Sequence, residues 1–217
     1  TPRDTYVPLY NVSGETKDKL THAGLYGPEC SMGTLATLYN TTIDYYVRVN
    51  FSSVIDIVEA LDGIDVYSAY NFSTHHLGGH YFQKGTNHLN GNSALAFCRE
   101  RYAFPDGDFQ RGRNHIEVIK GLINKITSPS ILVNYPDLIS ALSGTFQTNI
   151  PSEDLTNLIK MQLADGASWT IESMTLENTG GSSTTCYSLY GPALYVGFVK
   201  ESSRAAIEKA LSDLMYN

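Results

Sequence analysis

The stretch DYYVRVNFSSVIDIVEALDGIDVY, residues 44–67, decides the fold class because its hydrophobic period changes twice. Its first seven residues, 44–50, are rich in β-branched and aromatic side chains and predict a strand. Apolar residues then recur at helical spacing after the candidate caps Ser52 and Ser53, and Gly63 predicts the end of that helix. Residues 64–67 return to a strand pattern. A strand, a helix and a second strand in this order indicate an α/β protein.

The rest of the chain continues this alternation. Apolar residues from Ile116 to Ile126 predict the longest amphipathic helix, with Asp108 near its start. Pro151 opens another helix, and a last helix over residues 203–215 has Leu214 on its inward face. Because no Pro/Ser-rich linker or charge block interrupts the pattern, we predict one α/β domain over residues 1–217.

Residues 73–91 do not fit this alternation. They are rich in Gly, His and Asn and lack clear periodicity, which predicts a long surface loop. His76 and His80 have the spacing of a zinc pair, but that spacing aligns two imidazoles only on a helix. Gly78 and Gly79 oppose a helix, so a polar loop is the stronger prediction.

The composition of the 217-residue chain is that of a packed globular protein, with 42% hydrophobic and 17% charged residues. It excludes disordered, collagen-like and coiled-coil classes. The formal net charge of −7 means that the surface on average repels nucleic acid, so no nucleic-acid partner is expected. No window approaches the ~20 apolar residues that span a bilayer. Since the chain opens abruptly on charged, strand-like sequence at Thr1, we expect an upstream part that includes a membrane anchor.

Three cysteines are too few for a disulfide framework. Cys98 lies in an apolar run and is predicted to be a free buried thiol. Cys30 and Cys186 lie beside Gly and Pro in predicted loops and are the one pair that remains open.

Four of the seven arginines fall within fifteen residues of this acidic chain: Arg99, Arg101, Arg111 and Arg113. In an extended segment, Arg99 and Arg101 point to one face. Arg111 and His115 lie i, i+4 on the following helix, whose first turn adds free backbone N–H groups and a positive dipole end. Guanidinium groups bind phosphate bidentately, so the pattern favours a phosphate or pyrophosphate site.

A second interpretation of these arginines stays open. They pair equally well with Glu100, Asp106, Asp108 and Glu117 in a solvated surface network worth ~0 to 1 kcal/mol per pair. Asp108 favours the site, because a carboxylate among arginines can accept a proton from an attacking hydroxyl or hold a metal. Serine-hydrolase, P-loop and zinc-ribbon motifs are absent from the sequence.

The residues resemble the LytR-CpsA-Psr family, whose members attach polymers to bacterial cell walls. The resemblance begins at Pro2-Arg3-Asp4-Thr5-Tyr6-Val7 and runs through residues 17–23, 44–47 and 57–66. Its most specific part is His88-Leu89-Asn90-Gly91, then residues 94–101, then Gly107-Asp108-Phe109-Gln110-Arg111, in the family's order. It is strong to about residue 125 and weaker beyond.

The resemblance implies a three-layer α-β-α sandwich around a central mixed β-sheet, anchored at the extracellular face of the bacterial membrane. It implies a phosphotransferase that moves a glycopolymer, of teichoic acid or capsular polysaccharide type, from a polyprenyl-pyrophosphate carrier to peptidoglycan with magnesium assisting. On this resemblance Arg99, Arg101, Asp108 and Arg111 are catalytic. Arg3, Asp4, Lys19 and His115 bind substrate.

Three departures accompany the resemblance. The family segment with the magnesium aspartates does not precede Thr1, so the domain is expected to lack its membrane anchor and first strands. Asn114-His115 stands where many members have Arg-Gln, and His115 remains a hydrogen-bond donor. Arg113 is offset by one helical position and is predicted to point away from the site.

Two rival functions use the same residues. A non-catalytic module would bind polyprenyl-linked or anionic glycans through the arginines without transfer. A polyprenyl-pyrophosphate pyrophosphatase would pass the phosphoryl group to water.

Overall fold

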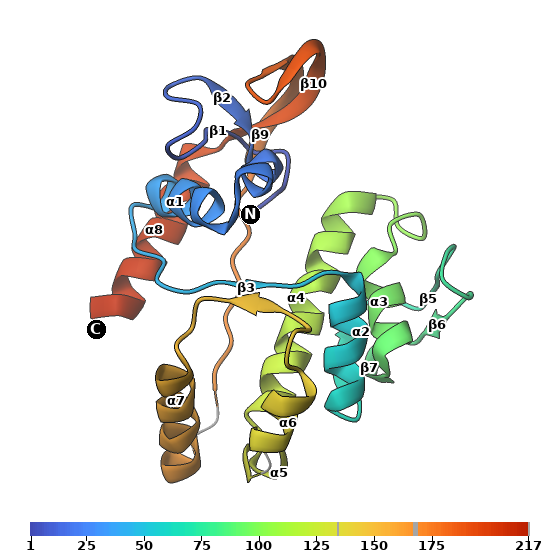
Figure 1. Ribbon diagram of the computed structural model, residues 1–217. Helices are drawn as coiled ribbons and strands as arrows, with labels where there is room; N and C mark the ends of the chain where they lie inside the picture. Colours follow the sequence, from blue (N-terminus) through green and yellow to red (C-terminus); the bar gives the residue numbers. More distant parts are fainter. Residues whose placement is uncertain (134, 167–168, 217) are drawn as a thin grey trace. The chain divides into compact units, whose positions relative to one another are not determined.

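The computed structural model describes residues 1–133, 135–166 and 169–216. The chain forms two compact units (Figure 1). Unit 1 combines residues 1–46 with residues from 173 onward, and unit 2 is the continuous segment 47–172. Each unit is described by itself below. The single domain over residues 1–217 stays a prediction.

Unit 2 holds most of the helices and the predicted arginine cluster. Its elements follow the chain in this order: β3 (Val47–Arg48), α2 (Phe51–Ala60), β4 (Ile64–Ser68), β5 (Phe72–Ser73), β6 (Tyr81–Phe82), β7 (Gly85–Leu89), α3 (Gly91–Arg99), α4 (Gly107–Ile126), α5 (Pro129–Val133), α6 (Tyr135–Ala141), β8 (Gln147–Thr148) and α7 (Ser152–Asp165). Its strands pair antiparallel in twos, as β4 with β7, β5 with β6 and β3 with β8.

Helix α2 begins two to three residues earlier than the sequence pattern suggested. Asn50 is its N-cap: the Asn50 side chain accepts the N–H of Ser53, and the Ser53 hydroxyl accepts the N–H of Asn50. This reciprocal pair satisfies two otherwise free donors of the first turn. Ser53 is therefore the third helical residue, and Ser52 is not a cap. The predicted strand 44–50 shortens to β3 because Asn50 is already part of the helix start.

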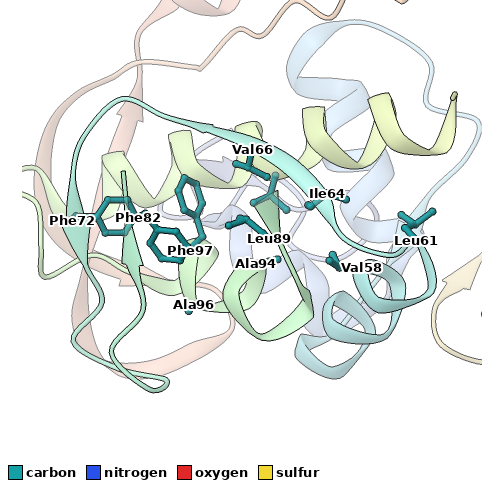
Figure 2. Close-up of a cluster of buried hydrophobic side chains, with 11 residues drawn as sticks. Val58, Leu61, Ile64, Val66, Phe72, Phe82, Leu89, Ala94, Ala96 and Phe97 are labelled. Carbon is teal, nitrogen blue, oxygen red and sulfur yellow. The ribbon is translucent and has the colours of Figure 1, made fainter. Parts of the chain in front are cut away.

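The core of unit 2 lies where β4, β7, α2 and α3 meet (Figure 2). The strand β4 alternates buried Ile64 and Val66 with exposed Asp65 and Tyr67, as a strand with one covered face should. Aromatic side chains extend this core. Phe72 lies 5.0 Å from Phe82 and 5.5 Å from Phe97 between ring centroids, and each of these rings is buried.

Residues 73–91 are more ordered than a surface loop. They contain β6 and β7, and β7 pairs along its whole length with β4. The loop prediction was wrong at β7. Its sequence, Gly85-Thr-Asn-His-Leu, has one large apolar residue and therefore shows no alternation of apolar and polar residues. The His-rich part between the strands has positive φ at Leu77, Gly78 and Gly79, which confirms that His76 and His80 are not on a helix.

Helix α4 was predicted correctly in its bounds but not in its buried face. Gln110, Asn114, Val118 and Gly121 are buried, whereas Ile119 is 53% exposed. Gly121 permits this packing, because a Cβ there would lie 2.7 Å from the carbonyl oxygen of Asp65 on β4. The helix therefore approaches β4 at Gly121, while Gln110 and Asn114 are buried through a hydrogen bond to each other and one to α3.

Unit 1 consists of β1 (Tyr6–Pro8), β2 (Lys17–Lys19), the 3-10 helix η1 (Leu20–Tyr26), α1 (Pro28–Tyr39), β9 (Asn178–Cys186), β10 (Leu189–Val199) and α8 (Glu201–Tyr216). β1 pairs with β2, and β9 with β10, both antiparallel. A parallel bridge joins Thr5 to Gly197. The last helix was predicted, but Leu214 is 83% exposed while Ile207 is buried.

The cysteines are free thiols. Cys30 lies inside α1 and Cys186 ends β9, so neither is in a loop as expected. Burial raises the pKa of Cys98 to about 12, which agrees with an unreactive thiol packed as a small hydrophobe.

Candidate functional site

The segment between α3 and α4 carries the arginine cluster, and Glu100 fixes its shape. Glu100 is 3% exposed. Its carboxylate accepts the backbone N–H groups of Arg101, Tyr102 and Ala103 at 3.0, 2.6 and 3.0 Å, and that of His75 at 2.7 Å. Burial by itself would raise the pKa of Glu100, but these four bonds outweigh it and hold the pKa below its usual value.

The structure shows which of the four carboxylates pair with arginines, as the surface-network interpretation required. The Glu100 carboxylate accepts hydrogen bonds from backbone N–H groups, and Glu117 pairs with Lys120 at 2.8 Å. Neither acts as an arginine partner. Asp106 and Asp108 do pair with arginines, as that interpretation expected.

Arg99 and Arg101 flank Glu100 in the sequence, but they do not lie in one extended segment as predicted, because Arg99 is the last residue of α3. The guanidinium of Arg99, the last residue of α3, lies over the ring of Phe51 at 4.5 Å from its centroid. The guanidinium of Arg101 lies 4.6 Å from the centroid of Tyr102 and donates to its hydroxyl at 2.5 Å. Aromatic faces hold guanidinium groups without neutralising them. Both side chains therefore keep donors for an anion.

Asp108 joins the two parts of the cluster. It lies in the first turn of α4, with one oxygen 3.7 Å from Nη1 of Arg101 and the other 3.3 Å from Nη2 of Arg111. Asp108 and Arg101 are about half exposed. The structure thus brings Arg101, Asp108 and Arg111 together, as the sequence predicted, at a surface that a ligand can reach.

His115 lies one turn beyond Arg111 on α4, and its Nε2 donates to the carbonyl of Cys98 at 2.8 Å. Burial lowers the pKa of His115, the bond to Cys98 opposes this, and the nearby charge of Arg111 lowers it further. The net direction is down, so the ring is neutral near pH 7. Its role in this structure is to tie α4 to the end of α3, and its predicted contact with substrate remains a prediction.

The neighbouring residues Asn114 and Arg113 point elsewhere. Asn114 is buried, accepts from Gln110 at 2.9 Å and donates to the carbonyl of Phe97 at 3.2 Å. Arg113 donates to Gln110 at 2.8 Å and pairs with Asp106. The prediction that Arg113 points away from Asp108 and Arg111 agrees with these partners.

The other candidate residues, Arg3, Asp4 and Lys19, belong to unit 1. Lys19 pairs with Asp4 at 2.8 Å, with 15% and 27% of the two side chains exposed. The Arg3 side chain is exposed and has no hydrogen-bond or ion-pair partner within the described part of the chain. That these three residues act with the cluster of unit 2 stays a prediction.

Sequence reasoning missed two residues that shape these clusters. The ring of Phe51 lies under the guanidinium of Arg99. The sequence shows only an aromatic residue at the start of a helix, which does not point to Arg99. Asp18 is fully buried beside Lys19 and accepts from His22 at 2.6 Å and from the N–H of Ser188 at 2.8 Å. Burial would raise the pKa of Asp18, but its bonds to Ser188, His22 and Lys19 lower it overall. No sequence signal linked Asp18 to a residue 170 positions away.

The cluster does not fit a magnesium ion by itself. Asp108 is flanked by two guanidinium groups, which favour an anion over a cation. Across residues 1–133, 135–166 and 169–216 no group of three or more His, Cys, Asp or Glu side chains is placed to hold a metal. In the same ranges, no helix combines the length and apolar character that crossing a bilayer requires.

The chain matches the model of the LytR_cpsA_psr family over residues 1–205. It therefore belongs to this family. This confirms the resemblance seen in the sequence.

Among relatives, the chain is 38% identical over 160 residues to the polyisoprenyl-teichoic acid–peptidoglycan teichoic acid transferase TagU of Bacillus anthracis, covering 73% of this chain and 51% of the relative. The crystal structure of B. subtilis TagV superposes with a TM-score of 0.80 at 26% identity, covering 98% of this chain and 80% of that one. A structure of TagT bound to LIIa-WTA superposes with a TM-score of 0.74 at 25% identity, covering 98% of this chain and 76% of that one.

These superpositions confirm the predicted α/β fold of the LytR-CpsA-Psr type. The chain spans about half the length of the curated relatives that it matches.

Proposed function

We propose that this chain is the transfer domain of a glycopolymer phosphotransferase. The observation that carries the proposal is the cluster of Arg101, Asp108 and Arg111, whose backbone is fixed by the buried Glu100. Arg99, which lies over the ring of Phe51, is proposed to bind the same anion. The relatives named as teichoic acid transferases support the same activity. The donor is a glycopolymer on a polyprenyl-pyrophosphate carrier, and the acceptor is a hydroxyl of peptidoglycan.

The arginines bind the pyrophosphate of the donor. Arg99 and Arg101 are held by aromatic rings and keep their charge, and Arg111 adds a third guanidinium at the start of α4. Positive groups around a pyrophosphate neutralise charge on the transferring phosphoryl and on the leaving phosphate, which is the main source of catalysis in phosphoryl transfer. Arg3 and Lys19 are proposed as further contacts, with Asp4 orienting Lys19.

Asp108 orients the acceptor hydroxyl and takes its proton. The hydroxyl oxygen forms a bond to the phosphorus that carries the glycopolymer, and the bond from this phosphorus to the bridging oxygen breaks. Polyprenyl phosphate leaves with the electron pair, and the proton passes to a carboxylate oxygen of Asp108. His115 is proposed to contact the substrate through Nδ1: the ring is neutral and its Nε2–H is bound to the carbonyl of Cys98, so Nδ1 accepts a hydrogen bond from a hydroxyl of the substrate.

Magnesium is proposed as the assisting ion, and it would neutralise phosphate charge. Because the residues of the cluster do not fit it alone, donor phosphates would supply much of its coordination, as is common for Mg²⁺. No step above depends on it.

We also propose that the protein acts at the outer face of the bacterial membrane, where peptidoglycan is accessible, and that it is anchored there. The teichoic acid class is favoured over capsular polysaccharide, because TagU is named for teichoic acid and TagT is described with LIIa-WTA bound.

A transfer assay with lipid-linked polymer and peptidoglycan fragments tests the proposal. Arg99→Ala and Arg111→Ala should each lower turnover by at least ~10²-fold, because each removes a charge that stabilises the transition state. Arg113→Ala is the matched control: it removes the same charge from the same helix, but its side chain is engaged with Asp106. It should keep most of the activity.

The same assay separates the rival functions. Labelled oxygen from water appearing in the released phosphate would identify a pyrophosphatase. Tight donor binding without product under any metal condition would identify a binding module. Unchanged turnover in both arginine variants would contradict the proposal.

A further inference from the structure

We infer that a pocket next to the arginine segment binds a neutral pyranose ring of the acceptor glycan. The pocket has a volume of about 340 Å³, within the range of small-molecule sites. It is lined by Tyr70, Asn71, Ala103, Phe104, Pro105 and Asp106. The inference deepens the proposed function and rests on it for the identity of the glycan.

One wall of the pocket is continuous with the arginine cluster. Ala103 is held by the Glu100 carboxylate, the same group that holds Arg101 and Tyr102. The wall then turns, with the N–H of Gly107 donating to the carbonyl of Phe104 at 3.2 Å, and leads directly into the first turn of α4. A ligand in the pocket therefore lies against the segment that also carries Arg101 and Asp108.

Tyr70 provides the surface on which a sugar ring packs. Its side chain is half exposed, and its ring lies 6.0 Å from the ring of Phe104 at an angle of 53°. The buried Ser68 hydroxyl donates to the carbonyl of Tyr70 at 2.7 Å, which fixes the turn that presents the ring. A fixed aromatic ring that is partly exposed to solvent suits a pyranose, because the sugar's apolar C–H face packs on the ring while its polar edge stays solvated.

Two polar side chains complete the pocket. The Oδ1 of Asn71 accepts the N–H of Lys84 at 2.7 Å, so its amide group is oriented, and its Nδ2 has no partner within the described ranges. Asp106 is held through Oδ2 by Arg113. An amide donor and a carboxylate acceptor beside an aromatic ring are what the hydroxyl and N-acetyl groups of a sugar require.

Charge distinguishes the acceptor from the donor. Asp106 is the charged residue among the six that line the pocket, and it is negative. Because Arg113 pairs with Asp106, the six lining residues offer no free cation to a phosphate, whereas a neutral sugar needs none. The donor's phosphates belong with the arginines, whereas the pocket suits an N-acetylated hexose of peptidoglycan.

Titration with N,N′-diacetylchitobiose, followed by NMR chemical shifts of the protein, tests this inference. Tyr70→Ala should weaken binding by about tenfold, because it removes the stacking surface. Asn71→Ala should weaken it by a smaller factor. Tyr67→Ala is the matched control, since Tyr67 is exposed to a similar extent three residues earlier but does not line the pocket.

Each variant is checked for an unchanged melting temperature, and Tyr70→Phe, which keeps the ring, should bind almost as the wild type does. Equal affinity in Tyr70→Ala and Tyr67→Ala, or no shifts in the wild type, would overturn the inference. Arg99→Ala/Arg111→Ala should bind chitobiose normally. If transfer is never observed but chitobiose binding maps to Tyr70, the proposed function fails while the sugar pocket stands.

Discussion

Glu100 is the residue on which the geometry of the arginine segment depends. A carboxylate this deeply buried normally destabilises a fold unless donors satisfy it. Here four backbone N–H groups do so, and three of them belong to the residues that follow it directly. The charge of Glu100 therefore sets the backbone from Arg101 to Ala103, and through it the position of Arg101 and of the pocket wall.

Glu100→Gln tests this at the level of one residue. The neutral amide accepts more weakly and adds donors that face other donors, so we expect the free energy of unfolding at pH 7 to fall by about 2 to 3 kcal/mol. The pKa of Glu100 is lower in the folded protein than its ordinary 4.5. Its stabilisation is thus complete above about pH 4.5 and is lost as the pH falls through the folded value. Urea unfolding at several pH values measures both effects.

We expect the difference in unfolding free energy between the wild type and Glu100→Gln to become smaller as the pH is lowered. Glu117→Gln is the control, because that carboxylate makes a partly exposed helical pair with Lys120, and it should change stability by less than about 1 kcal/mol. Equal stability of Glu100→Gln and wild type at pH 7 would contradict this account of the segment.

At the scale of elements, α4 connects the cluster to the core. Its first turn carries Asp108 and Arg111, and its middle packs on β4 at Gly121. Asn114 and His115 bond to carbonyls near the end of α3. The position of the first turn is therefore set by contacts about one to three turns further along the helix.

Two glycines of α4 offer a matched test of this packing. Gly121→Ala places a methyl group 2.7 Å from the carbonyl of Asp65, so the helix must shift, and we expect a loss of about 1 to 3 kcal/mol in unfolding free energy. Gly112→Ala meets nothing within 4 Å and should stabilise the helix by up to about 1 kcal/mol. Thermal or urea unfolding distinguishes the two, and two changes of the same sign would show that α4 does not approach β4 as described.

The sequence predicted elements well where their period was clear, as in α4, α7 and α8. It failed where a tertiary contact overrode the local pattern. The β7 strand was missed because its pairing with β4, not its own apolar residues, makes it a strand. The buried face of α4 was misplaced because Gln110 and Asn114 are buried through hydrogen bonds that depend on α3.

At the scale of the molecule, the arginine cluster could be predicted because its residues lie close in the sequence and on two adjoining elements. The residues that surround and orient the cluster could not be predicted from the sequence. Phe51 reaches Arg99 from another helix, and Glu100 looked like one more surface carboxylate until its backbone partners were known. Residues of unit 1 were assigned from the family pattern alone, and Arg3, Asp4 and Lys19 remain predictions.

The central claim is that the arginines of unit 2 bind a lipid pyrophosphate. Calorimetric titration of the protein with polyprenyl pyrophosphate, with and without magnesium, measures this directly. Arg99→Ala/Arg111→Ala removes two charge-assisted contacts and should weaken binding at least about a hundredfold, whereas Arg113→Ala should bind nearly as the wild type does. Saturable binding that the double variant loses and Arg113→Ala retains is the predicted result. Binding of equal strength in all three proteins would contradict the account.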